Sequence, residues 1–181
     1  MTGFVREARE ADALAITQVQ IASWQHAYAG IFTADQLASM STPEVVAAWE
    51  GRWRDLITNP PTSRHRVMVA ITGGTRDAVG FAFAGPANDE DRWPQTDGQL
   101  YELRVLPDQT GQGHGSRLLH AVASTLADDG FQTATTWVSS ADKALRQFLE
   151  SSGWAPDGAR AELDFDYTTV QTMRLHTRVA E

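Results

Sequence analysis

Residues 99–119, with the sequence QLYELRVLPDQTGQGHGSRLL, constrain the fold of this chain more than any other stretch. Apolar and polar residues alternate at its start, which predicts a strand that ends at Pro107, because proline cannot donate to a ladder. Three glycines then occupy alternate positions, at Gly111, Gly113 and Gly115. An apolar stripe at helical spacing follows at once and runs to Gly130, a natural C-terminal stop. The sequence therefore predicts a strand, a glycine-rich loop and a helix in that order.

This order of elements favours an anion at the loop. The start of a helix carries unpaired N–H groups and partial positive charge. Glycines without Cβ atoms let such amides close around a phosphate. A plain glycine-rich turn between a strand and a helix is the alternative, and the glycines alone leave it open.

Two common phosphate loops do not fit. The pattern Gly-x-x-x-x-Gly-Lys-Ser/Thr is absent, and Gly-x-Gly-x-x-Gly begun at Gly111 needs a glycine where Ser116 stands. Ser116 also lacks the Gly-x-Ser-x-Gly context of a nucleophilic serine. The five histidines lack metal-ligand spacing, so we expect no metal site.

A third pattern fits. Val105-x-Pro107 followed by GQGHGSRLL resembles the acetyl-CoA signature of the GCN5-related N-acetyltransferases, the GNAT family. Gly113 and Gly115 take the two glycine positions of the signature, and Thr110 stands where arginine or glutamine is usual. The resemblance implies that the loop amides hold the coenzyme pyrophosphate, with contacts from Gly111, Gln112, Gly113, His114, Gly115 and Ser116.

Three further motifs resemble the same family in the same order along the chain. They are Ser23-Trp24-x-x-Ala27-Tyr28-x-Gly30-Ile31, Val79-Gly80-Phe81, and Thr136-Trp137-Val138 together with Gly153-Trp154-x-Pro156-Asp157-Gly158. The resemblance implies an α+β (mixed α/β) fold with a central, mostly antiparallel sheet flanked by helices. The sheet is expected to splay between its two central strands, and residues 1–181 are expected to form a single N-acetyltransferase domain.

Periodicity and turn residues predict the elements of this fold independently. Strands are expected at residues 4–8, 67–71, 79–83, 100–105, 133–138, 160–165 and 170–176. Helices are expected at 12–28, 33–40 and 43–57, after the glycine loop, and from a cap at Ser140 to Gly153. Residues 85–98 read as a polar loop.

The resemblance also implies a reaction, in which an amine of a small molecule or peptide attacks acetyl-CoA directly in a ternary complex. A backbone N–H near Leu103, Arg104 and Val105 is expected to bind the thioester oxygen. Asp142 takes a coenzyme-contacting position that is commonly asparagine. Two departures concern proton transfer: Gln99 stands where relatives carry a glutamate base, and Leu149 where they carry a tyrosine that reaches the sulfur.

Other residues are candidates for the missing proton transfers. Glu102 is a candidate base, although simple alternation puts it on the opposite face from Gln99 unless a bulge intervenes. The alternative for Glu102 is a solvated or salt-bridged strand residue. Tyr28 is a candidate catalytic residue, with core packing as its alternative. These departures also keep a second function open, a catalytically impaired CoA-binding sensor or structural module.

Composition and charge exclude or disfavour several classes of protein. A chain of 181 residues with 42% hydrophobic residues can bury a sizeable core. The absence of cysteine excludes a disulfide framework and a thiol nucleophile, and the net charge of −8 disfavours nucleic acid as a partner. The sequence shows no apolar run of membrane-spanning length and no signal-peptide core, so we expect no membrane partner and a cytoplasmic location. A homodimer is left open.

Overall fold

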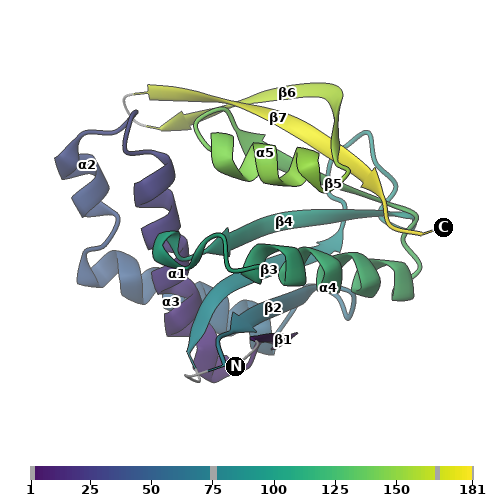
Figure 1. Cartoon of the computed structure of the whole chain (residues 1–181), viewed down its shortest axis with the longest axis horizontal. Helices are drawn as coiled ribbons and strands as arrows, with labels where there is room; N and C mark the ends of the chain where they lie inside the picture. The colour runs from purple at the N-terminus through teal and green to yellow at the C-terminus, as the bar shows by residue number, and fades with distance from the viewer. Residues whose placement is uncertain (1–2, 74–76, 166–167, 181) are drawn as a thin grey trace.

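The computed structural model describes residues 3–73, 77–165 and 168–180. Its strands are β1 (Phe4–Glu7), β2 (Arg66–Ile71), β3 (Ala78–Pro86), β4 (Asp97–Val105), β5 (Thr133–Ser139), β6 (Ala155–Phe165) and β7 (Thr168–Arg178). Its α-helices are α1 (Ala13–Ala27), α2 (Ala34–Ser39), α3 (Pro43–Thr58), α4 (His114–Asp128) and α5 (Lys143–Ser151), as Figure 1 shows. Across these ranges, none of the helices combines the length and apolarity needed to cross a bilayer.

All seven strands belong to one sheet of order β1-β2-β3-β4-β5-β7-β6. Neighbouring strands are antiparallel except β4 and β5, which are parallel. The predicted mixed α/β fold with a mostly antiparallel sheet and flanking helices is confirmed.

The sheet splays between β4 and β5. These strands pair only from Asp97 with Thr133 to Gln99 with Thr135. The rest of β4 has β3 as its ladder partner, while β5 continues against β7. The predicted splay is therefore present, and in Figure 1 α5 lies between β4 and the β6–β7 hairpin.

The sheet has an apolar core on each face. Helix α4 packs on one face through Leu118, Val122 and Leu126. Helices α1 and α3 pack on the other, where Trp53 meets Phe81 with ring centroids 5.0 Å apart. The opposed helices fix the end of β4 from both sides.

A bulge at Tyr101 changes which way β4 presents its side chains. Phe83 pairs with Glu102 and Ala84 with Leu100, so Tyr101 is an extra residue on β4. Leu100 and Leu103 consequently share the face toward α4. Glu102 lies on the same face as Gln99, toward α1, so the expectation from simple alternation is wrong.

Several element boundaries differ from the sequence prediction, and three of the differences have a clear physical reason. Strand β3 continues through Gly85 to Pro86 because its ladder with β4 continues, which shortens the expected loop at 85–98. Strand β6 begins at Ala155, since its pairing with β7 starts there. Helix α5 is capped by Asp142 instead of Ser140.

Candidate functional site

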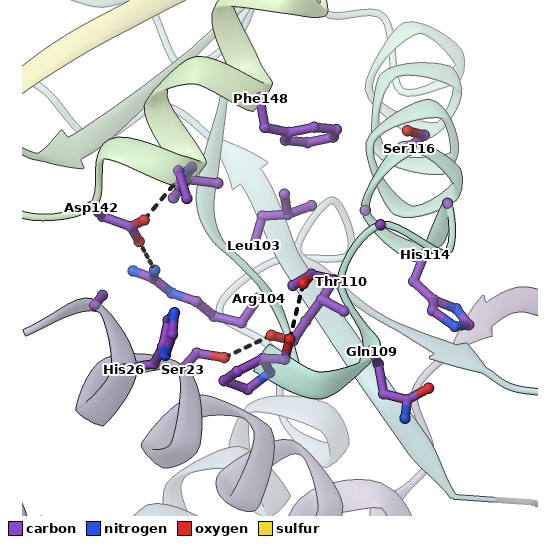
Figure 2. A pocket seen from close by; sticks show the side chains of 18 residues that line it. Ser23, His26, Leu103, Arg104, Gln109, Thr110, His114, Ser116, Asp142 and Phe148 are labelled. Atoms are coloured by element: carbon purple, nitrogen blue, oxygen red, sulfur yellow. Dashed lines mark hydrogen bonds and ion pairs between the residues drawn. The ribbon is translucent and has the colours of Figure 1, made fainter. Parts of the chain in front are cut away.

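A cavity of about 440 Å³ opens at the end of β4, where the sheet splays. It is lined by Leu103, Arg104 and Val105 on β4, by Gly111, Gly113, His114, Gly115 and Ser116 at the start of α4, and by Asp142 before α5. Figure 2 shows these elements around one hollow, with the last turn of α1 below it and Phe148 of α5 above it. Every predicted coenzyme contact except Gln112 lines this cavity.

The glycine loop ends with free amides at one side of the cavity. Gly111 and Gly113 have φ of 74° and 78°, in the left-handed region that favours glycine. Gly113 is the residue before α4, and its position carries no side-chain cap among the described residues. The amides of His114, Gly115 and Ser116 therefore lack protein acceptors within the described chain. This is an arrangement that binds an anion such as a phosphate.

The side chain of Arg117 stabilises the loop through contacts with Gln112 and His114. Its Nη2 donates to the carbonyl of Gln112 at 3.1 Å and lies 3.1 Å from Nδ1 of His114. Burial and the nearby Arg117 lower the pKa of His114 below its ordinary value. Gln112 thus contributes its carbonyl to the loop structure.

Helix α5 closes the cavity opposite the loop. A Cβ at Gly115 would lie 3.4 Å from Cζ of Phe148, so a larger residue there would press against α5. Asp142 accepts a hydrogen bond from the amide of Leu145 at 3.0 Å and caps the helix.

Arg104 forms the far side of the cavity, and 13% of its side chain is exposed. Its Nε donates to Oε1 of Glu102 at 2.5 Å, and its Nη1 donates to Oδ2 of Asp142. Burial opposes the charge, but the two carboxylates outweigh it and raise the pKa of Arg104 above its usual value. The guanidinium is therefore a permanent cation in this wall.

Helix α1 contributes residues that sequence reasoning did not assign to the cavity. Ser23 lines it and donates from Oγ to the carbonyl of Val105 at 3.0 Å, which ties α1 to the end of β4. His26 lines it one turn later. The first-helix motif Ser23-Trp24-x-x-Ala27-Tyr28 was the available signal, but the motif alone does not show which of its residues face the cavity.

The two catalytic candidates lie outside the cavity lining. Glu102 faces α1, where Oε1 also accepts from Nε1 of Trp24 at 3.4 Å. Tyr28 is buried with its ring centroid 5.4 Å from Phe32 and 6.1 Å from Phe165. This environment fits the packing alternative for Tyr28, and its catalytic role stays a prediction.

Other hydroxyl groups that could replace the missing tyrosine are also engaged elsewhere. Leu149 is fully buried in the core and does not line the cavity. The hydroxyl of Tyr101 donates to the carbonyl of Pro86, and that of Ser151 donates to the carbonyl of Phe148.

Within the described ranges, no group of three or more His, Asp or Glu residues is placed to hold a metal.

Sequence comparison shows what this chain resembles. A model of the acetyltransferase (GNAT) family matches residues 25–154, which is more than half of the chain. The chain is 32% identical over 135 residues to the uncharacterized N-acetyltransferase YuaI of Bacillus subtilis (strain 168). That alignment covers 74% of this chain and 70% of YuaI.

Many solved structures share the fold, and two of them were determined with coenzyme A or acetyl-CoA. PaiA N-acetyltransferase from Thermoplasma acidophilum, in complex with coenzyme A, has a TM-score of 0.75 and 16% identity, with 98% of this chain and 99% of that chain covered. YncA from Salmonella typhimurium, with its cofactor acetyl-CoA, has a TM-score of 0.65 and 19% identity, covering 100% and 96% respectively. At these identities the likeness concerns the fold.

Proposed function

The chain belongs to the acetyltransferase (GNAT) family, and from this premise we propose that it transfers an acetyl group from acetyl-CoA to a primary amine of a small molecule or peptide. The observation that carries the proposal is the cavity at the splay, with unpaired amides at one end and the end of β4 at the other. The unpaired amides suit the diphosphate of the coenzyme, and the free end of β4 suits its extended pantetheine arm.

The residues present fit the coenzyme. The amides of His114, Gly115 and Ser116 would bind its diphosphate, and positive helix-end charge would favour that anion. The splay leaves the last residues of β4 without a β5 partner, so their backbone is available to a bound arm. Acetyl-CoA would supply the acetyl group as a thioester.

Residues of this chain would then serve the transfer. We assign the thioester oxygen to a backbone N–H in the region of Leu103, Arg104 and Val105. We assign Glu102, directly or through water, the proton of the attacking amine. Its Oε2 has no partner within the described ranges, although Oε1 is paired with Arg104 and Trp24. Attack would be direct, without a covalent enzyme intermediate.

A second candidate function is a CoA-binding module with impaired catalysis. Gln99 is 6% exposed, and its Oε1 accepts from the amide of Asn88 at 3.2 Å. An amide side chain in this setting cannot take a proton, and Leu149 cannot give one. These two positions favour this candidate over an efficient enzyme.

The two functions are separated by binding and turnover measured on the same protein. Calorimetry with CoA and acetyl-CoA tests the site, and thiol release across simple amines, polyamines, aminoglycosides and peptides tests catalysis. Release with an acceptor supports the transferase. Binding without release on the whole panel supports the module, and the absence of binding to either coenzyme form contradicts both.

A further inference from the structure

One buried cation in the cavity wall has no role in the function proposed above. Arg104 is the one lysine or arginine among the described residues that line the cavity. Its Nε and Nη1 are paired with Glu102 and Asp142, whereas its Nη2 has no hydrogen-bond partner in the described ranges. Nη2 keeps some contact with solvent, so it is accessible from the cavity. A buried guanidinium with one unpaired nitrogen in a cavity is a built site for an acceptor atom.

The position of Arg104 relates it to the reacting end of the coenzyme. This step rests on the proposed function, in which the diphosphate lies at the amides of His114, Gly115 and Ser116. Arg104 lines the same cavity on β4, across from those amides, as Figure 2 shows. An arm extended from the diphosphate end therefore leads the thioester toward the wall that Arg104 forms.

The reaction needs a stabilising group at this wall. As the amine nitrogen bonds to the carbonyl carbon, the carbon–sulfur bond breaks and sulfur leaves with the electron pair. The surplus proton of the amine goes to a base or water. The hydroxyl of Ser23 donates to the carbonyl of Val105, and Leu149 lies in the core. The described lining thus offers no tyrosine, and the departing thiolate has no phenolic donor there.

We propose that Arg104 is a further catalytic residue, whose free Nη2 donor and charge stabilise the departing thiolate of coenzyme A. A guanidinium is not a proton donor at neutral pH, so this stabilisation is electrostatic. Glu102 and Asp142 hold the guanidinium in place and oppose its charge at long range. The effect on sulfur therefore comes from direct contact with Nη2. His26 is the remaining titratable group on this side of the lining.

The titration of bound CoA tests this role without any acceptor. A free thiol has a pKa of about 8.5, and an opposite charge within about 4–6 Å lowers the pKa of an acid by roughly 1–3 units. Thiolate absorbance in the ultraviolet reports the pKa of the CoA thiol when the protein is saturated. We expect Arg104→Gln to raise the pKa of bound CoA by about 1 unit or more, and Arg104→Lys to restore part of the shift.

Arg104→Gln leaves the carboxylates of Glu102 and Asp142 without their cationic partner, and a second background removes the effect of those two charges. In the double variant Glu102→Gln, Asp142→Asn, both side chains keep their size but carry no charge. The comparison of Arg104 with Arg104→Gln in this background isolates the cation. The same rise in the thiol pKa is expected there, with the dissociation constant of CoA changed less than about threefold because the diphosphate site is intact.

The possible results decide separate questions. An unchanged thiol pKa in both backgrounds overturns the role of Arg104, and so does a large loss of CoA affinity without a pKa change, which would assign Arg104 to binding. Failure of the wild-type chain to bind CoA overturns the proposed function itself. With an acceptor in hand, Arg104→Gln is expected to lower kcat about tenfold or more at unchanged KM for acetyl-CoA, matching a one-unit shift.

Discussion

Arg104 and Asp142 join the two sides of the splayed sheet. The guanidinium lies near the end of β4, and the carboxylate precedes α5, which follows β5 in the chain. The ladder between β4 and β5 stops at Gln99, well before Arg104. The ion pair thus links the strands where backbone pairing no longer does, and it does so at the wall of the cavity.

This linkage predicts an ordered effect of substitutions at Asp142. Asp142→Ala removes both one partner of a buried cation and the cap of α5. We expect a loss of about 2–4 kcal/mol in the free energy of unfolding, since a hydrogen bond to a charged group contributes about 1.5–3 kcal/mol and the cap about 1 kcal/mol, while Glu102 remains as a carboxylate partner of Arg104. Asp142→Asn keeps an acceptor for the amide of Leu145, and it should retain the roughly 1 kcal/mol of the cap. Urea unfolding measures both losses. Equal losses would contradict the capping role of Asp142, and an Asp142→Asn variant as stable as wild type would contradict the ion-pair account.

Substitutions at two glycines with positive φ can separate the effect of backbone strain on stability from the effect of the loop on coenzyme binding. Gly113→Ala forces a Cβ onto a residue with φ of 78° and 3.0 Å from Nη1 of Arg117. We expect a stability loss of about 1–2 kcal/mol and at least tenfold weaker CoA binding, because the loop amides shift.

The matched control for this change is Gly130→Ala, at the other end of α4. Gly130 has φ of 85°, and its Cβ would meet nothing within 4 Å. A similar stability loss with unaltered CoA affinity by calorimetry is expected. Equal weakening of CoA binding in both variants would mean that the loop is not the site.

The glycine loop was predictable because its signal is local. Proline, three glycines and an apolar stripe within residues 99–119 specify the strand end, the turn and the helix start without knowledge of the rest of the fold. The bulge at Tyr101 was not, because it depends on the register between β3 and β4. Simple alternation failed for Glu102 for this reason alone, since one extra residue reverses the alternation, as the stated bulge alternative allowed.

The wall of the cavity depends on contacts between distant segments. Arg104 and Asp142 were both expected near the coenzyme by resemblance, but their pairing across 38 positions has no local signature. Ser23 and His26 reach the cavity because α1 packs beside the end of β4. Sequence periodicity placed a helix there without fixing its rotation relative to the sheet.

The absence of a side chain at Gly80 allows α4 to pack closely against the sheet. A Cβ at Gly80 would lie 2.9 Å from the carbonyl oxygen of Arg104 and 3.2 Å from Cδ1 of Leu118. Gly80→Val should therefore cost about 1–3 kcal/mol through overpacking. In contrast, Gly51→Ala on α3 meets nothing within 4 Å and should stabilise the protein by about 0.5–1 kcal/mol. Thermal or urea unfolding that showed Gly80→Val as neutral would contradict this packing.

The ion pairs of Arg174 with Asp91 and Asp157 should make the free energy of unfolding fall in acid. Its hydrogen bond to Asp91 lowers the pKa of that carboxyl to about 2 despite an opposing desolvation effect. Burial would raise the pKa of Asp157, but the amide of Ala159 and the guanidinium groups of Arg174 and Arg92 outweigh it and lower that pKa. Both pKa values lie below the unfolded value of about 3.9. Their contribution is therefore present above about pH 4 and lost as the pH falls toward 2.

The acid window is tested by Asp91→Asn. This variant should be less stable than wild type at pH 7, and its stability should decline less steeply between pH 4 and 2, because one titration is removed. Glu90→Gln is the neighbouring control, since Glu90 is not among the partners of Arg174. Urea unfolding across this pH range measures the slopes, and parallel slopes for wild type and Asp91→Asn would contradict the prediction.

Glu102 carries the sharpest test of the proposed proton transfer. If its carboxylate takes the proton of the amine, Glu102→Gln should lower kcat by about 100-fold or more, because general bases contribute 10²–10⁴-fold. The amide keeps an oxygen for Nε of Arg104 and Nε1 of Trp24, so the geometry of the wall is preserved. Glu162→Gln on the exposed β6 is the control and should leave kcat unchanged. Retention of kcat within about threefold, at any pH, would leave proton removal to water.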